Sequence, residues 1–162
     1  MKRILALFET RPIWQKSALD EQLFDLVDEI PAWKQVEAIR MISFHAVDGP
    51  WRNTHIRFGY DPRRHPEARR WQSIDFRDPF LRDSQTNIVT QKGGLLDCHF
   101  RVAPVNRSQM FQLCDVEDSV VQAMLRMLPA ASTCNEKSGW FEETDLEKFR
   151  NQLKVRSELL RK

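Results

Sequence analysis

The stretch GPWRNTHIRFGYDPRRHPEARRWQSIDFR occupies residues 49–77 and decides how the rest of the sequence is interpreted. Its seven arginines outnumber its three carboxylates, which leaves the stretch near +4. Ile56 and Phe58 before the Asp-Pro turn, and Ile74 and Phe76 after it, alternate with polar residues, as in strands with one packed face. The stretch therefore predicts a basic β-hairpin over residues 51–77, which is a candidate nucleic-acid contact.

Two helical patterns precede this hairpin. Apolar residues at helical spacing predict one helix over residues 18–29 and a second over residues 32–46, which Asp48-Gly49-Pro50 ends. Helix, short break, helix and hairpin is the order of a helix-turn-helix followed by a wing. The predicted fold class is therefore α+β, of winged-helix type, with a β-hairpin wing and additional C-terminal helices.

The remainder of the sequence predicts a loop, a strand and two more helices. These are a polar loop over residues 77–94, a strand over 95–102, a helix capped by Asp115 or Asp118 that ends at Pro129, and a helix over 143–160. The expected organisation is a winged-helix-like core over residues 1–105, which includes the hairpin, and a helical extension over residues 106–162 packed on it. One compact domain is the alternative.

Composition and charge indicate an ordinary globular chain with an uneven charge distribution. The 162 residues are 41% hydrophobic, with a net charge of +2. No apolar run reaches the length of about 18 residues that a membrane-spanning helix needs, and the N-terminus is too quickly polar for a signal peptide, so neither membrane nor secretion is expected. Residues 113–149 are near −5, which suggests that they face away from nucleic acid or cover a basic surface.

Motifs for catalysis, cofactors and metals are missing from the sequence. It has no Gly-rich phosphate loop, no His-Glu-x-x-His and no nucleophile elbow, so we expect no catalytic residue, no cofactor and no small-molecule substrate. The three cysteines are widely spaced, which favours free thiols in a reducing compartment. Cys98 lies beside His99, but no second close ligand pair accompanies it, so no metal site is predicted.

The candidate DNA contacts are the polar side chains outside the apolar stripe of the second helix and the basic side chains near the hairpin turn. They are Lys34, Arg40, Arg52, Arg63, Arg64, His65, Arg69 and Arg70. Arg57 and Arg77 lie on the predicted strands and are expected to pair with Asp75. The large aromatic residues are expected in the core, namely Trp14, Trp33, Trp51, Phe58 and Phe76.

Three other interpretations of the same residues stay open. Arginines also protect the edge strands of sheets, so the basic hairpin could be a solvated edge. A protein-docking module would use the aromatic residues and the acidic C-terminal region instead of the hairpin. Binding of single-stranded nucleic acid would need exposed stacking side chains, for which Tyr60 and Trp71 are the candidates.

Several stretches of the sequence resemble one family of transcription proteins. They are RPIW from Arg11, GPWR from Gly49, RFGYDPR from Arg57, HPEAR from His65, WQSIDFR from Trp71, QMFQLCD from Gln109 and GW from Gly139. Over residues 11–156 the chain resembles the C-terminal region of the fifth subunits of transcription factor TFIIIC, the tau-A subunits that bind box A. RFGYDPR followed by PEAR and DFR is a long and specific match.

The resemblance implies a function that periodicity and composition do not show. It implies a winged-helix domain of the RNA polymerase III machinery in the nucleus, which binds double-stranded DNA at box A of transfer RNA genes. Other TFIIIC subunits would be its partners. The family's N-terminal dimerisation domain and acidic tail have no counterpart in this sequence, so the resemblance implies a single module. No base-contacting residue belongs to the matched motifs, so the site residues rest on charge and position alone.

Overall fold

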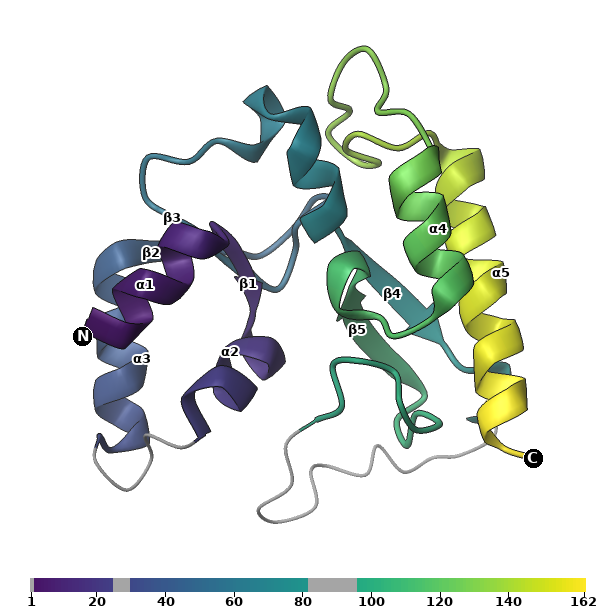
Figure 1. Cartoon of the computed structure of the whole chain (residues 1–162), viewed down its shortest axis with the longest axis horizontal. Helices are drawn as coiled ribbons and strands as arrows, with labels where there is room; N and C mark the ends of the chain where they lie inside the picture. Colours follow the sequence, from purple (N-terminus) through teal and green to yellow (C-terminus); the bar gives the residue numbers. More distant parts are fainter. Residues whose placement is uncertain (1, 25–29, 82–95) are drawn as a thin grey trace.

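Two small antiparallel sheets organise the fold of the computed structural model within the described residues, which are 2–24, 30–81 and 96–162 (Figure 1). One sheet lies in each half of the molecule, and helices pack beside each of them. The N-terminal half holds the first sheet, and the two C-terminal helices lie along the outer side of the second. The chain crosses from one sheet to the other through residues 58–72.

The first half has the element order of a winged helix. Its three strands lie in the order β1-β3-β2, and Ile56 of β3 pairs with Ile13 on one side and Phe44 on the other. Three helices pack around Trp14 of β1. The elements are α1 Lys2–Thr10, β1 Ile13–Gln15, α2 Lys16–Leu23, α3 Ala32–Ile42, β2 Ser43–Ala46 and β3 Thr54–Arg57.

The second helix is shorter than the sequence predicts. The pattern predicts a helix to residue 46, but α3 ends at Ile42, and Ser43 takes an extended backbone while its hydroxyl donates to the Ile39 carbonyl at 2.7 Å. Residues 43–46 pair with β3 instead, because strand pairing satisfies their backbone groups as well as a helix would. For the predicted helix over 18–29, the structure shows α2 to Leu23, and residues 25–29 lie outside the described part of the chain.

The wing is a different hairpin from the one that the sequence predicts. Both predicted strands form, as β3 Thr54–Arg57 and β4 Ser73–Arg77, but they do not pair with each other. β3 pairs with β2, so the wing spans residues 43–57, whereas β4 pairs with β5 Ser108–Gln112 in the second sheet. The prediction of a hairpin over residues 51–77 is therefore wrong, because the alternation of apolar and polar residues identifies a strand but not its partner.

Two 3-10 turns replace the expected hairpin tip. They are η2 Pro62–Arg64 and η3 Pro66–Trp71, and each begins with a proline, whose fixed φ suits a first helical position. The Asp61 carboxylate caps η2 by accepting from the backbone N–H of Arg63 at 3.1 Å. Ala68 of η3 is buried, and its carbonyl accepts the indole N–H of Trp51 at 3.0 Å. The turns are thus packed against the wing.

The second half is built around β4, β5 and two helices. Its core contains Phe76, Phe100, Phe111 and Phe149, and the remaining elements are η4 Pro79–Leu81, η5 Leu113–Asp115, α4 Ser119–Met127 and α5 Glu143–Leu160. Asp118 caps α4 by accepting from two backbone N–H groups at 3.0 Å, which confirms the predicted cap. Residues 96–102 form no strand, contrary to prediction, and most of the predicted loop lies outside the described residues.

A third hydrophobic cluster joins the two halves. It contains Ile13 and Ile56 from the first sheet, Trp51 from the wing, and Trp140 from the segment before α5. The indole N–H of Trp140 donates to the Pro62 carbonyl at 2.9 Å. The predicted boundary at residue 105 falls between β4 and β5, which pair with each other, and the division into two parts stays a prediction. Within the described residues, no helix combines the length and apolar character needed to span a membrane.

We expect Gly139→Ala to destabilise the protein strongly. Gly139 has a φ of +67°, and an added Cβ would overlap the side chain of Gln72. That amide is held in place, because it accepts from the Trp140 N–H at 2.7 Å and donates to the Ser138 carbonyl at 2.9 Å. Strain and the displaced amide together should lower the free energy of unfolding by about 3 kcal/mol or more, measured by urea denaturation.

Gly59→Ala is the matched control for this substitution. Gly59 also has a positive φ, +81°, but nothing lies near its missing Cβ. It should therefore show only the conformational cost, about 1–2 kcal/mol. Equal losses in the two variants would contradict the role of the Gln72 contact.

Candidate nucleic-acid interface

The exposed face of α3 carries both cations and apolar side chains. Lys34 and Arg40 are exposed, as predicted for groove contacts, and the Lys34 ammonium lies 5.3 Å from the centre of the Trp33 ring. Trp33 itself is 60% exposed and Met41 is 70% exposed. The prediction that Trp33 lies in the core is therefore wrong, as it is for Phe58, which lies just beyond β3. Trp14, Trp51 and Phe76 are buried as expected.

The wing contributes one predicted contact residue, Arg52. Its guanidinium lies 3.7 Å from the Asp75 carboxylate of β4, so its charge is partly neutralised. Arg77 also pairs with Asp75, at 3.3 Å, which confirms that part of the prediction. Arg57 instead donates to the Phe8 carbonyl at 3.2 Å and serves the packing of α1.

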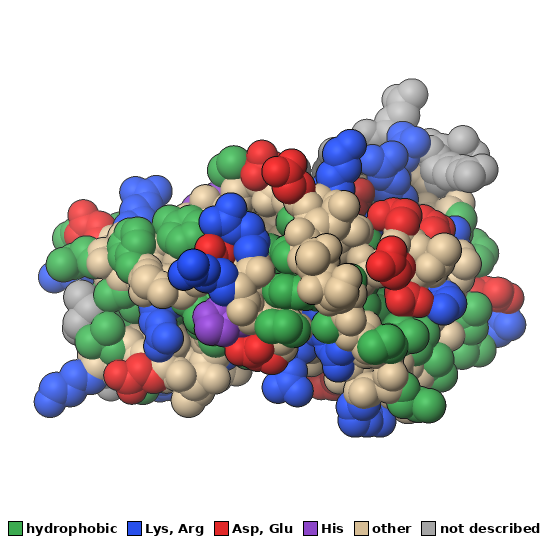
Figure 2. Space-filling model, turned by 90° about the horizontal axis from the view of Figure 1, so that it is seen from above, with side chains coloured by type: hydrophobic (Ala, Val, Ile, Leu, Met, Phe, Trp, Pro, Cys, Tyr) green, Lys and Arg blue, Asp and Glu red, His purple; other side chains and the backbone are tan. Residues whose placement is uncertain are grey.

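Three predicted contacts lie on or beside η2. Arg63 is paired with the Asp61 carboxylate at 2.9 and 3.0 Å, and this hydrogen-bonded guanidinium lowers the pKa of Asp61. Arg64 is exposed, and no described carboxylate lies within ion-pair distance of it. His65 stacks on the Tyr60 ring at 4.7 Å. Figure 2, which looks down on this end of the molecule, shows basic side chains beside a histidine near the middle of the face.

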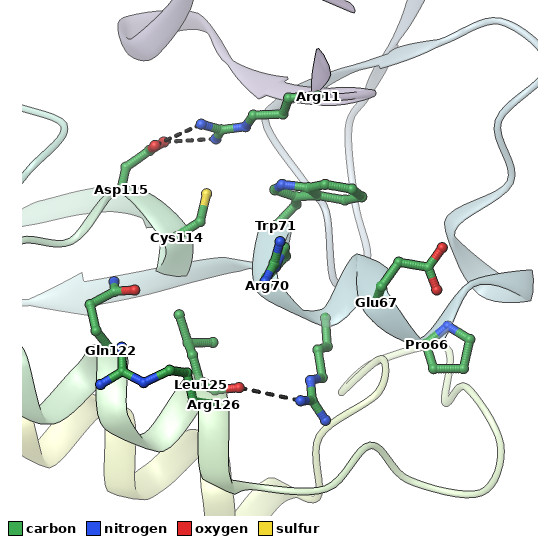
Figure 3. Close-up of a pocket in the computed structure, with 11 residues that line it drawn as sticks. Arg11, Pro66, Glu67, Arg70, Trp71, Cys114, Asp115, Gln122, Leu125 and Arg126 are labelled. Carbon is green, nitrogen blue, oxygen red and sulfur yellow. Dashed lines mark hydrogen bonds and ion pairs between the residues drawn. The ribbon is translucent and has the colours of Figure 1, made fainter. Parts of the chain in front are cut away.

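Arg69 and Arg70 line a pocket of about 910 Å³ between η3 and α4 (Figure 3). Arg69 donates to the Leu125 carbonyl at 3.3 Å, while Arg70 is exposed beside Trp71. Arg126 of α4 borders the same pocket and is exposed; the sequence offered no signal for it, because it stands in the acidic stretch. Arg11 also borders the pocket, but its guanidinium is held by both oxygens of Asp115, at 2.6 and 2.7 Å.

The structure thus divides the predicted site residues among separate surfaces. Lys34 and Arg40 share α3, Arg52 and Arg63 border a pocket of about 1080 Å³ beside the wing, and Arg69 and Arg70 border the pocket beside α4. Tyr60 and Trp71 are half-buried and contact each other edge to face, so neither ring presents an open stacking platform.

The acidic residues of α5 are paired within that helix. Arg150 contacts Glu143 at 3.0 Å and Glu147 at 2.6 Å, and Lys148 contacts Asp145 at 2.7 Å. These carboxylates therefore pair with cations of their own helix and do not cover the arginines of η2 and η3. In the part of the acidic stretch before α5, Glu136 borders the pocket that holds Arg52 and Arg63.

The arrangement defines the class of the domain. Three helices and a three-stranded sheet in the order α1-β1-α2-α3-β2-β3, with an exposed α3 and a β2–β3 wing, make a winged helix. Residues 1–77 match the Tau95 model, described as the helix-turn-helix domain of an RNA polymerase III transcription factor TFIIIC subunit. The N-terminal part of the chain is therefore similar to the Tau95 family, which confirms the resemblance noted in the sequence.

Curated relatives and one solved structure agree with this family. The chain is 28% identical to transcription factor tau subunit sfc1 of Schizosaccharomyces pombe over 151 residues, which are 91% of this chain and 30% of the relative. It is 38% identical to human general transcription factor 3C polypeptide 5 over 71 residues, which are 44% of this chain and 13% of the relative. Both are transcription factor subunits, and the chain spans less than a third of their length.

The solved structure is similar over nearly the whole chain. Sfc1-DBD superposes with a TM-score of 0.70 and 27% sequence identity, covering 98% of this chain and 74% of the other. This similarity includes the second sheet and the C-terminal helices as well as the winged helix. It confirms the predicted α+β fold of winged-helix type with additional C-terminal helices.

A histidine on the first sheet should make stability depend on pH. His55 lies 5.2 Å from the His45 ring, and burial together with the charges of His45, Lys16 and Arg40 lowers its pKa from 6.5 to about 4. The unfolded chain therefore binds a proton that the folded chain does not bind between these values. The contribution of His55 to the free energy of unfolding is full above about pH 6.5. It should fall by about 1–2 kcal/mol as the pH drops toward 4, a figure reduced for the solvent screening of a half-buried group.

The variant His55→Gln tests this by urea denaturation at several pH values. The variant should lose less stability than the wild type between pH 6.5 and 4. Identical pH dependence in His55→Gln and the wild type would show that His55 does not carry the effect.

Proposed function

We propose that this chain is a DNA-binding module of TFIIIC that acts in the nucleus and contributes to the recognition of box A of transfer RNA genes. The observation that carries the proposal is the winged helix, similar to Sfc1-DBD over 98% of the chain, with Lys34 and Arg40 exposed on α3. In helix-turn-helix proteins the second helix enters the major groove, and α3 holds that place here. Other TFIIIC subunits are the proposed protein partners.

The arginines differ in how readily they can contact phosphate. Arg40, Arg64 and Arg70 are exposed, and no described carboxylate neutralises them. Arg63 is paired with Asp61, but the pair is exposed and screened by solvent, so phosphate can displace the carboxylate. Arg69 and Arg52 already have partners within the chain. We therefore assign the main phosphate contacts to Arg64 and Arg70, with Arg63 joining them.

A second candidate function is docking of another protein. Trp33 and Met41 on α3 and Val47 in the wing, which is 79% exposed, place large apolar side chains on the surface where a winged helix meets DNA. Exposed apolar groups of this size favour protein contacts more than phosphate contacts. A docking module without DNA contact would bind no duplex even at low salt, which separates the two functions.

Removing one arginine of η2 and one of η3 should weaken DNA binding and its salt dependence. In Arg64→Ala/Arg70→Ala, two phosphate contacts are lost, so the slope of log K against log salt should become shallower by about 2. Fluorescence anisotropy with a duplex that contains box A, between 50 and 200 mM salt, measures both quantities.

The matched control is Arg107→Ala/Lys154→Ala. It removes two exposed charges, one from the residue before β5 and one from α5. This variant should keep the wild-type slope. An unchanged slope in Arg64→Ala/Arg70→Ala would remove these residues from the interface, and absence of binding by the wild type at 50 mM salt would favour docking.

The α3 cations should affect sequence preference more than the η2 and η3 arginines do. If α3 lies in the major groove, Lys34→Ala/Arg40→Ala should narrow the affinity ratio between a box A duplex and a scrambled duplex, because base contacts carry the specificity. Arg64→Ala/Arg70→Ala should lower both affinities about equally. Equal affinity of the wild type for the two duplexes would count against box A recognition by this module alone.

A further inference from the structure

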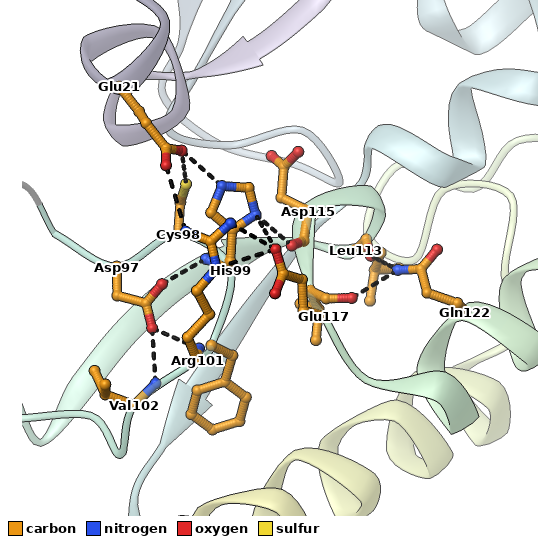
Figure 4. A network of polar contacts seen from close by, with 12 residues as sticks. Glu21, Asp97, Cys98, His99, Arg101, Val102, Leu113, Asp115, Glu117 and Gln122 are labelled. Atoms are coloured by element: carbon orange, nitrogen blue, oxygen red, sulfur yellow. Dashed lines mark hydrogen bonds and ion pairs between the residues drawn. The ribbon is translucent and has the colours of Figure 1, made fainter. Parts of the chain in front are cut away.

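We propose that Glu21, Cys98 and His99 form a binding site for a zinc-like divalent cation. The sequence shows only the Cys98-His99 pair, with no second ligand pair nearby. The fold supplies a third donor from the far end of α2, because Glu21 lies against both residues although it is 77 and 78 positions away along the chain (Figure 4).

The three donor atoms converge on one point. The Glu21 Oε2 atom lies 2.6 Å from His99 Nε2 and 3.4 Å from Cys98 Sγ, and the three atoms all lie within 4.8 Å of one another. Zinc binds sulfur at about 2.3 Å and nitrogen or oxygen at about 2.0–2.2 Å, so its tetrahedral ligands are roughly 3–4 Å apart. Small side-chain movements would therefore admit the ion.

The orientation of the imidazole suits a metal ligand. His99 Nδ1 lies 2.9 Å from the Asp115 carbonyl oxygen, to which an Nδ1–H would donate. The Nε2 atom points toward Glu21, to which an Nε2–H donates in the ion-free chain, and a metal ion would take the place of that proton. Metal-binding histidines usually have this second hydrogen bond to a carbonyl or carboxylate, which fixes the ring and its tautomer.

The surroundings of the cluster favour a cation. Asp97 and Glu117 flank it, and the Glu117 carboxylate lies 3.8 Å from His99 Nδ1. Arg101 is the opposing charge, but it is bound to Glu117 at 2.6 Å and reaches only the other oxygen of Glu21, at 3.6 Å. The Asp115 carboxylate and the Arg11 guanidinium, which bind each other at 2.6 Å, form a further ion pair nearby. A thiolate and a carboxylate would neutralise a divalent ion at the ligands themselves.

Burial separates this cluster from an ordinary surface group of acidic residues. Cys98 is 2% exposed and packs in the core of the winged helix, while Glu21 and His99 are half-buried at its edge. One side of the cluster therefore stays open for water as a fourth ligand. The Asp97 carboxylate also accepts the backbone N–H groups of His99, Arg101 and Val102, which holds the segment in place.

A bound ion would fasten the two halves of the molecule together. Glu21 belongs to α2 of the winged helix, whereas His99 contacts η5 through the Asp115 carbonyl. An ion that binds the folded chain and not the unfolded chain raises the free energy of unfolding with its concentration. The site would thus stabilise the docking of the winged helix on the second sheet, independently of DNA binding.

Titration with Co²⁺ tests the proposal, because a cobalt–thiolate bond gives a near-ultraviolet charge-transfer band that oxygen and nitrogen ligands do not give. The full chain should develop this band at one Co²⁺ per chain, and Zn²⁺ should abolish it by competition. Cys98→Ser should lack the band, and Glu21→Gln should bind Co²⁺ at least tenfold more weakly. Cys134→Ser, which alters a thiol outside the cluster, should keep the band.

Each other outcome overturns the proposal. A wild-type chain that shows no thiolate band has no such site, and this measurement does not depend on the folding of any variant. A band that persists in Cys98→Ser assigns the metal to another cysteine. As a second measurement, Zn²⁺ should raise the Tm of the wild type and Cys134→Ser but not that of Glu21→Gln; equal shifts in all three would mean that the ion binds elsewhere.

Discussion

The buried amide of Gln112 is the interaction on which the arrangement of the two halves depends. Its oxygen accepts from the Arg11 guanidinium and from the Gln15 N–H at 2.6 Å, and its nitrogen donates to the Trp71 carbonyl at 2.8 Å. One fully buried side chain of β5 thus joins β1 and η3. Because an unsatisfied buried amide costs about 1–3 kcal/mol, these three segments are held in one relative position, and Arg11 is set to bind Asp115.

These contacts of Gln112 also determine where the basic side chains lie on the surface. The chain between β3 and β4 is a bridge from one sheet to the other, so its arginines do not lie along a single hairpin face. Arg69 and Arg70 end up beside Arg126 of α4, whereas Arg52 and Arg63 stay near the wing. A duplex on α3 would therefore meet the η3 arginines only in the orientation that the contacts of Gln112 fix, because these contacts hold η3 against β1.

Local signals in the sequence predict local structure well and predict spatial partners poorly. The bounds of α5, residues 143–160, and the Asp118 cap follow from apolar spacing and capping chemistry, which act within a few residues. Alternation identifies β3 and β4 as strands, but their partners are chosen by packing that the pattern does not contain. The same limit hides the contact of Glu21 with His99 and the exposure of Trp33, since each depends on which surfaces the fold covers.

The burial of each arginine, more than the number of arginines, determines which of them can contact a DNA duplex. The pair between Arg63 and Asp61 is exposed and screened by solvent, so phosphate can compete with the carboxylate for Arg63. The pair between Arg11 and Asp115 is only 14% and 11% exposed, and separating it would leave a carboxylate unpaired in a largely buried position. Arg11 therefore stabilises the fold that presents Arg63 and Arg64. The basic stretch has a net charge near +4, but fewer of its arginines can contact DNA than that charge suggests.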